Sequence, residues 1–206
     1  PFDWLNITKE DISRTESYVS NSARKTLQIQ FKDYQEYLKA LEMESEVGPL
    51  DKNNLERFTQ LINKSNQFNL RTQRYSEGTI SQMTSSPDYR LLTVKLSDKF
   101  SKFGIISCII LKKEESECFI DTWVMSCRVL KRDVEKLVFN HIVKEAVNWK
   151  CERITGEYIP TVKNKLVKNL LPELGFELIE TDDTGKERYS CSVELAKYNK
   201  TMIKER

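Results

Sequence analysis

The sequence predicts an α/β (α+β) fold, in which a mixed, mainly antiparallel sheet is flanked by helices and preceded by a long N-terminal helix. Three runs rich in β-branched and aromatic residues follow one another between residues 89 and 125, separated by short polar turns. Such runs are typical of antiparallel strands. After residue 125 helical and extended patterns alternate to the end of the chain, and helices on both faces of one sheet would bury the apolar residues of both.

The N-terminal part is distinct from the rest. An apolar side chain recurs every three or four positions, which predicts one helix over about 12–41. Val47-Gly48-Pro49 marks its end, because glycine favours a helix terminus and proline cannot continue a helix. We therefore expect residues 1–47 to be a helical linker and residues 48–206 to be the main domain. The apolar stripe must be covered, by the main domain, a second copy or a domain missing upstream.

Helix-capping residues, the period of the apolar residues and the positions of glycine and proline predict the other helices and strands. The cap Asp51 starts a helix whose polar end, Asn63–Asn69, either frays on the surface or lines a polar site. The predicted elements are a helix over 51–69, strands over 89–96, 103–111 and 118–125, a helix over 133–149, a strand over 153–159, a basic helix over 162–171, and strands over 176–180 and 189–195.

Composition excludes several classes of function. The 206 residues contain 33 Lys and Arg against 31 Asp and Glu, a net charge of +2, so bulk charge does not favour nucleic acid. No apolar run approaches the roughly 18 residues that a membrane-spanning helix needs, and the N-terminus lacks a secretion signal. We expect a cytoplasmic protein with no nucleic-acid or membrane partner. The chain starts at Pro1 without Met, which indicates a piece of a longer protein.

Five cysteines, an odd number with no C-x-x-C pair, disfavour a disulfide framework and a thiolate zinc site. The single histidine, His141, lies inside the apolar arc of the helix over 133–149, which favours a core position over a catalytic one. We expect no metal site in this chain.

The junction between the strand over 118–125 and the next helix is the most informative stretch. A helix N-terminus presents unpaired N–H groups that suit a phosphate, and Arg128, Lys131 and Arg132 would add positive charge there. Solvated charge at a helix start is the alternative. Cys127 lies where the helix dipole and Arg128 can activate a thiol, or it is an ordinary half-buried cysteine.

A second candidate site follows the strand over 153–159. Pro160 stops the strand, and Thr161 can cap the next helix. Glu157 and Tyr158 point to opposite faces, so one of the two can face a cleft. The basic helix that follows either attracts phosphate or presents a solvated face.

The order of these elements, closed by Leu174-Gly175-Phe176, resembles the GNAT acyltransferase fold. Over nearly its full length the chain also resembles the C-terminal part of the FkbH-like family, in which a haloacid-dehalogenase-like (HAD-like) domain precedes a GNAT-like domain. The stretches that carry this second resemblance are Arg14–Tyr18, Asn63–Tyr75, Leu96–Phe100, Ile120–Leu130 and Pro160–Asn164.

The resemblance implies an acyltransferase that moves a small, glyceryl-like acyl group to the thiol of an acyl carrier protein or of coenzyme A (CoA). The implied cofactor is CoA or the phosphopantetheine of the carrier protein. The implied partners are that acyl carrier protein and an upstream HAD-like domain of the same protein, whose Asp-x-Asp motif does not occur in this chain.

The resemblance also assigns residues. Cys127 is the candidate acyl-accepting nucleophile, and residues 128–133, here called loop 128–133, match the GNAT loop that binds the pantetheine pyrophosphate. Lys131 and Asp133 replace its two glycines, and Leu171 replaces the tyrosine general acid of many GNAT enzymes. The residues assigned to the cofactor are Arg128, Val129, Leu130, Lys131, Arg132 and Asp133; those assigned to the substrate are Asn66, Asn69, Asp121, Glu157 and Asn164.

Two other functions remain open. The missing glycines and Leu171 favour a degenerate GNAT-like module that docks a carrier protein or the upstream domain without chemistry. The apolar stripe of the N-terminal helix favours an assembly unit that forms a homodimer through residues 12–41.

Overall fold

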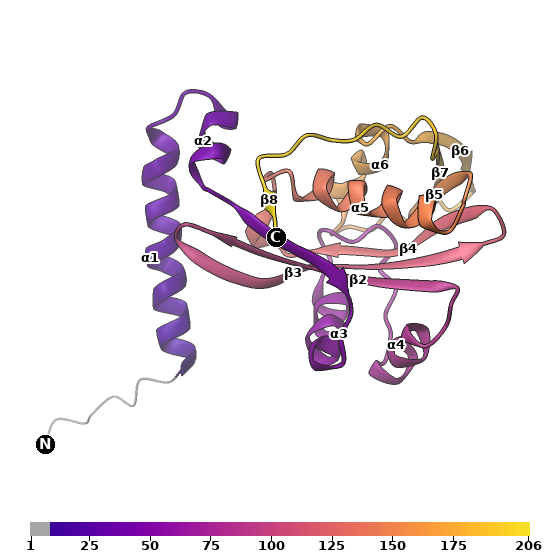
Figure 1. The fold of residues 1–206 in the computed structure, drawn as a ribbon, viewed down its shortest axis with the longest axis horizontal. Helices are drawn as coiled ribbons and strands as arrows, with labels where there is room; N and C mark the ends of the chain where they lie inside the picture. Colours follow the sequence, from indigo (N-terminus) through magenta and orange to yellow (C-terminus); the bar gives the residue numbers. More distant parts are fainter. Residues whose placement is uncertain (1–8) are drawn as a thin grey trace, which may run out of the picture.

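The computed structural model describes the backbone of residues 9–206 and the side chains from Tyr18 onward. Eight strands form one sheet in the order β6-β7-β5-β4-β3-β2-β1-β8. The pairs β4–β5 and β1–β8 run parallel, and the other five pairs are antiparallel. Helices flank this sheet on both faces, so the predicted fold class is confirmed (Figure 1).

The centre of the sheet is the predicted meander of three strands. It consists of β2 (Tyr89–Asp98), β3 (Ser101–Glu114) and β4 (Glu117–Met125). The register places Ile109 of β3 between Leu92 of β2 and Trp123 of β4. β3 is buried without interruption from residue 105 to residue 111. A strand buried on both sides is the expected result of helices on both faces.

Two apolar cores lie on the two faces of the sheet. α3 (Leu55–Lys64) and α4 (Glu77–Thr84) cover one face. α3 lies within the predicted helix over 51–69, whereas α4 was not predicted. α5 (Val134–Asn148) and α6 (Leu170–Glu173) cover the other (Figure 1). Burying one such aliphatic or aromatic side chain contributes about 1.5–3 kcal/mol, so both cores stabilise the sheet directly.

The N-terminal part corrects the prediction of one long helix. α1 (Lys9–Ile29) and α2 (Tyr34–Ala40) are separate, because Asp33 has an extended backbone and its carboxylate accepts a hydrogen bond from the N–H of Gln35. This bond caps a new helix. α1 stands beside the turn between β2 and β3, at one end of the sheet (Figure 1). Residues 1–8 of the predicted linker lie outside the described residues.

The residues predicted to end the N-terminal helix form a strand instead. β1 (Glu44–Pro49) runs antiparallel to β2 and pairs Gly48 with Thr93. The predicted boundary between residues 47 and 48 therefore falls inside a strand of the main sheet. Pro49 fits because it ends the strand near the sheet edge, where a missing N–H costs little.

The C-terminal part holds β5 (Arg153–Tyr158), β6 (Glu177–Thr181) and β7 (Glu187–Ser192), close to the predicted strands. The predicted basic helix over 162–171 is wrong. It is replaced by a loop, the 3-10 turn η3 (Lys165–Val167) and α6. The Asn164 side chain accepts from the N–H of Thr161 and donates to the carbonyl of Ile159, which holds the start of this segment in a loop. Pro172 keeps α6 short, because proline is tolerated only in the first turn of a helix.

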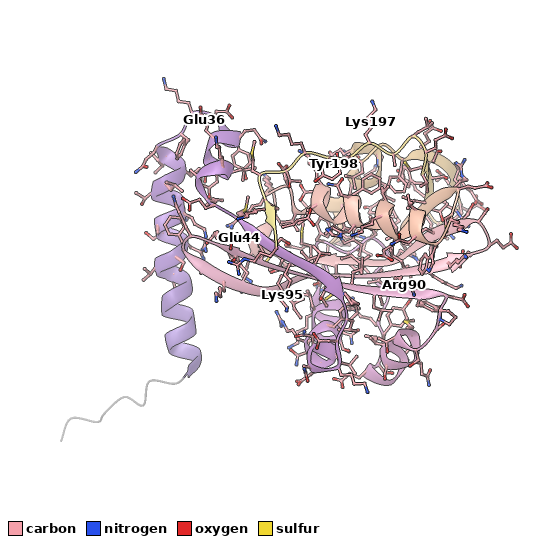
Figure 2. The ribbon with its side chains drawn as sticks, in the orientation of Figure 1. Glu36, Glu44, Arg90, Lys95, Lys197 and Tyr198 are labelled. Atoms are coloured by element: carbon pink, nitrogen blue, oxygen red, sulfur yellow. The ribbon has the colours of Figure 1, made fainter. Side chains whose placement is uncertain are left out.

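The edge of the sheet beside β1 is short and charged. β8 (Lys204–Glu205) pairs with only two residues of β1, and Arg206 forms an ion pair with Glu44. Glu44 lies on β1, and Lys95 of the neighbouring β2 forms an ion pair with Glu46 of β1 (Figure 2). Short, charged edge strands oppose pairing with further chains. His141 of α5 is half-buried, and its Nε2 lies 2.6 Å from Oε2 of Glu205, so it joins α5 to β8.

Candidate functional site

β4 and β5 diverge toward their C-terminal ends. Residues 117–120 of β4 pair with residues 153–156 of β5, but β4 continues to Met125. A segment of the loop between α3 and α4 fills the space. Asn69 forms an isolated β-bridge with Val124 of β4, and the N–H of Ile159 donates to the carbonyl of Leu70 over 2.9 Å. Residues 68–70, here called the bridging segment, therefore join the two diverging strands.

The chain leaves β4 through Ser126 and enters a single 3-10 turn, η2 (Cys127–Val129). Cys127 is exposed in this turn, whereas the other four cysteines are buried, and all five are unpaired. Burial raises the pKa of each of those four thiols and so lowers their thiolate fraction: Cys108, Cys118, Cys151 and Cys191. Of the two predicted environments for Cys127, the half-buried one does not occur.

Cys127 lines a cavity with a volume of about 730 Å³ between α3, the loop after it and the end of β4. Arg57, Lys64 and Lys163 also line it, and no acidic side chain does so among the described residues. None of these three cations forms an ion pair with a described residue. The cavity therefore has a positive potential and attracts anionic ligands.

Loop 128–133 keeps the backbone conformation that glycine favours. Lys131 has φ +63° and Asp133 has φ +60°, and these are the two positions at which the resembled loop carries glycine. The left-handed region costs a non-glycine residue roughly 1–3 kcal/mol. The loop thus has two residues in the left-handed conformation, and neither of them is the glycine that would adopt it without strain.

The charged side chains of loop 128–133 divide into two groups. Arg128 and Lys131 are exposed. Arg132 is largely buried, and its Nη1 donates to Oδ2 of Asp98 over 3.1 Å. Asp133 is buried and pairs with Lys136, with Oδ1 and Nζ 2.9 Å apart. Arg128 and Lys131 therefore remain available to an anion, whereas Arg132 is committed to the protein.

The three predicted substrate-binding amides do not share one role. Asn66 lines the cavity of Cys127, and its Oδ1 accepts a hydrogen bond from Arg74. Asn69 is buried; its Oδ1 accepts from the N–H of Thr72 and its Nδ2 donates to the carbonyl of Ser65. Asn164 is fully buried and uses both amide hydrogens and its oxygen within the protein. Only Asn66 faces the cavity among these three.

Asp121 and Glu157 come together around Arg71, away from the residues that line the cavity. Arg71 places Nη1 3.1 Å from Oδ2 of Asp121 and Nε 3.0 Å from Oε2 of Glu157, and its guanidinium lies over the Phe119 ring at 4.8 Å. Tyr75 donates to Oδ1 of Asp121 over 2.7 Å. Burial and this hydrogen bond raise the pKa of Tyr75, so it stays a donor.

Sequence reasoning missed Arg57, Arg71 and Tyr75. Arg71 and Tyr75 lie in the Asn63–Tyr75 stretch, but their partner Asp121 lies 50 and 46 residues further along the chain. Nothing local signals that contact. Arg57 has a signal that went unused, because it lies one turn after the cap region of α3, on the helix next to the amide-rich loop.

No family model matches the sequence, and no curated protein matches it either. Solved structures do match. The ribosomal-protein-S18-alanine N-acetyltransferase from Escherichia coli has a TM-score of 0.54 and 13% identity, over 76% of this chain and 98% of that chain. The GNAT domain of S. lividans PAT has a TM-score of 0.55 and 16% identity, over 71% and 89%.

The spermidine N-acetyltransferase from Vibrio cholerae, solved in complex with CoA and spermine, has a TM-score of 0.55 and 11% identity, over 73% of this chain and 96% of that chain. This chain has the GNAT fold. The identities are low, so the match establishes the fold and not the reaction. The GNAT resemblance of the sequence is confirmed at that level.

Within the GNAT fold of this chain, Leu171 is buried in α6 and packs on Gly156 of β5, with its Cδ1 3.2 Å from where a Cβ on Gly156 would lie. No proton donor stands at this position. Among the described residues no group of His, Cys, Asp and Glu is arranged to hold a metal ion. No helix in the described part of the chain is long and apolar enough to cross a membrane.

Proposed function

We propose that this chain is an acyltransferase domain that takes an acyl group from a CoA or phosphopantetheine thioester onto Cys127. One observation carries the proposal: Cys127 is exposed just after β4, lines a cationic cavity and directly precedes loop 128–133. The GNAT fold supports CoA as the cofactor, because the Vibrio cholerae spermidine N-acetyltransferase, with the same fold, was solved with CoA.

The reaction would proceed in two balanced steps. The Cys127 thiolate attacks the thioester carbonyl, a new C–S bond forms to Sγ, and the C–S bond to the pantetheine breaks. The leaving thiolate takes up the proton that Cys127 released. A second thiol then reverses the sequence, so the energy of one thioester is conserved in the next. The site needs only a thiolate fraction and hydrogen-bond donors to the transient oxyanion.

The residues around Cys127 suit these steps. Arg128 directly follows Cys127 in the chain and Lys131 lies three residues further on; both are exposed and can pair with the phosphates of the pantetheine arm. Asn66 lines the cavity with its amide and can hydrogen-bond a polar acyl group, in line with the glyceryl-like group that the FkbH-like resemblance implies. Leu171 supplies no acid, and a thiol leaving group does not need one in the bond-breaking step, because a thiol with a pKa of about 8.5 can leave as the thiolate and take up its proton afterwards.

The partners belong to the same proposal. An acyl carrier protein would present the accepting or donating thiol, and its acidic surface would complement Arg57, Lys64 and Lys163 around the cavity. A HAD-like domain upstream in the same protein would supply the acyl group. The proposed location is the cytoplasm, where cysteines stay reduced.

A second candidate function is docking without chemistry. It is favoured by Leu171 and by the bridging segment, which already occupies backbone groups of β4 between the two diverging strands. A docking module would bind the carrier protein and leave its thioester intact.

Intact-mass analysis separates the two functions. The chain is incubated with a panel of acyl-CoA thioesters and with acylated carrier protein. We expect an adduct of the acyl mass that hydroxylamine removes, and we expect it to disappear in Cys127→Ser but persist in Cys151→Ser. An equal adduct on Cys127→Ser removes Cys127 from the reaction. Carrier binding without any adduct favours docking.

A further inference from the structure

The N-terminal helices contact loop 128–133 directly, at two points. Tyr34, the first residue of α2, donates from its hydroxyl to the carbonyl oxygen of Lys131 over 2.5 Å. Arg24 of α1 reaches Asp98, which also binds Arg132 of the loop. Segments separated by about 100 residues in the sequence therefore meet at the candidate cofactor loop.

The contact with Lys131 bears on the loop backbone. The carbonyl that accepts from Tyr34 belongs to the first of the two left-handed residues, so the bond fixes the orientation of that peptide unit. A neutral hydrogen bond contributes about 0.5–1.5 kcal/mol, the same order as the cost of one left-handed non-glycine residue. Burial raises the pKa of Tyr34, which keeps the hydroxyl in its donating form.

The second contact is a buried ionic cluster. Asp98 accepts from Nε of Arg24 over 2.7 Å, from Nη2 of Arg24 over 2.8 Å and from Nη1 of Arg132 over 3.1 Å. Both guanidinium groups also lie over the Phe103 ring, that of Arg24 at 4.6 Å and that of Arg132 at 5.1 Å from its centroid. Two cations that share one carboxylate and one ring hold the loop against the β2–β3 turn and α1.

We infer that the N-terminal helical segment is part of the cofactor site, with Tyr34 and Arg24 acting as positioning residues that hold loop 128–133 in the left-handed conformation that glycine at positions 131 and 133 would adopt without strain. The inference rests on the proposed function for the identity of the ligand, but not for the positioning itself. α1 and α2 then belong functionally to the domain that the sequence places after residue 47. Neither residue touches the ligand; each acts through the loop.

Hydrogen exchange on the whole chain tests the positioning without any ligand. We expect the amides of residues 130–135 to exchange faster in Tyr34→Phe and in Arg24→Met. The matched controls are Tyr18→Phe and Lys25→Met, which remove a hydroxyl and a positive charge, respectively, at exposed positions of α1. If Arg24→Met does not fold, the result for Tyr34→Phe alone tests the inference, because this substitution removes only the hydroxyl oxygen and leaves the ring in place. Unchanged exchange in Tyr34→Phe overturns the inference.

Titration with CoA by calorimetry tests the link to the ligand. Tyr34→Phe should raise the Kd for CoA about 2–10-fold, the effect of one neutral hydrogen bond. Lys131→Gly removes the cost of the left-handed backbone at this residue, whereas Lys131→Ala keeps that cost; both variants lack the lysine cation. Tyr34→Phe should therefore raise the Kd for CoA less in the Lys131→Gly background than in the Lys131→Ala background. A purely structural role predicts equal effects in both backgrounds.

The outcomes separate the two proposals. Faster exchange together with weaker CoA binding supports both. Faster exchange in a chain that does not bind CoA even as the wild type supports the positioning and overturns CoA as the ligand. Faster exchange with unchanged CoA affinity overturns the assignment of Tyr34 to the cofactor site.

Discussion

The side-chain nitrogen of Asn164 donates to the main-chain carbonyl of Asn69 over 2.9 Å, across 95 residues of sequence. The same nitrogen donates to the carbonyl of Ile159, also over 2.9 Å, and the side-chain oxygen accepts from the N–H of Thr161 over 2.7 Å. One buried amide thus holds the bridging segment beside the end of β5. This side chain supplements the main-chain contacts of the bridging segment with Val124 and Ile159.

Asn164→Ala should therefore destabilise the chain. It removes a buried hydrogen bond to the carbonyl of Asn69 and two partly buried ones, to the carbonyl of Ile159 and from the N–H of Thr161. Each buried unsatisfied group costs about 1–3 kcal/mol. We expect a loss of at least about 2 kcal/mol in the free energy of unfolding, measured by urea denaturation. Asn169→Ala is the control, because Asn169 is exposed and makes no capping hydrogen bond. Equal losses in both variants would contradict the prediction.

A second prediction concerns thiol reactivity. Limiting iodoacetamide should alkylate one cysteine rapidly, and peptide mapping should place the adduct on Cys127, the exposed cysteine. Cys108 and Cys118 should react slowly, because burial raises their pKa and blocks access. The fast adduct should vanish in Cys127→Ser and remain in Cys151→Ser. Fast labelling of any buried cysteine in the native chain would refute the description of the site.

The sequence predicted those parts of the fold whose signal is local and repeated. β2, β3, β4 and α5 have strong periodicity over nine or more residues, and all four occur where expected. β1 was missed because Gly48 and Pro49 signal a helix end as readily as a strand end. The break between α1 and α2 was missed because the capping bond of Asp33 competes with an apolar stripe that continues through it.

The candidate site was predictable in its position and less so in its contacts. The strand-to-helix junction around Cys127 has a local pattern, and the structure places an exposed thiol there. Asp121, Glu157 and Asn164 were assigned to the substrate, yet each is bound by residues distant in sequence. The topology of the sheet brings these partners together, and the spacing of the residues along the chain does not predict these contacts.

Glu135 gives a prediction about pH. It lies in the first turn of α5, where the helix dipole favours a negative charge by about 0.3–1 kcal/mol, but its Oε2 is buried without a partner among the described residues. Burial, reinforced by the nearby Asp133, outweighs the dipole and raises the pKa of Glu135. The folded state thus holds this proton more tightly than the unfolded state.

A raised carboxyl pKa contributes stability at low pH that is lost as the pH rises through the folded pKa. Glu135→Gln should therefore stabilise the chain at pH 7, and the gain should shrink toward pH 4. Thermal denaturation at both pH values measures this. The control is Glu36→Gln, an exposed first-turn glutamate of α2 (Figure 2), where we expect a slight loss at pH 7. A loss in Glu135→Gln at pH 7 would reverse the sign and refute the argument.

The pKa of Asp98 is shifted in the opposite direction to that of Glu135. Burial opposes its ionisation, but hydrogen bonds from Arg24 and from the N–H groups of Phe100 and Ser101 outweigh burial, so the pKa of Asp98 lies below its usual value. A lowered carboxyl pKa contributes stability that is present above the unfolded pKa and is lost as the pH falls through the folded pKa.

Asp98→Asn should destabilise the chain at pH 7 by about 3–5 kcal/mol, because it leaves the buried guanidinium groups of Arg24 and Arg132 without a counter-charge. The difference from the wild type should narrow as the pH falls toward 3, because the unfolded wild-type chain then takes up a proton at Asp98 that the folded chain binds less tightly. Urea denaturation at both pH values measures the two differences, and Asp183→Asn, at an exposed position, is the control. A constant difference between pH 7 and pH 3 would mean that packing, and not the charge of Asp98, holds α1 to the sheet.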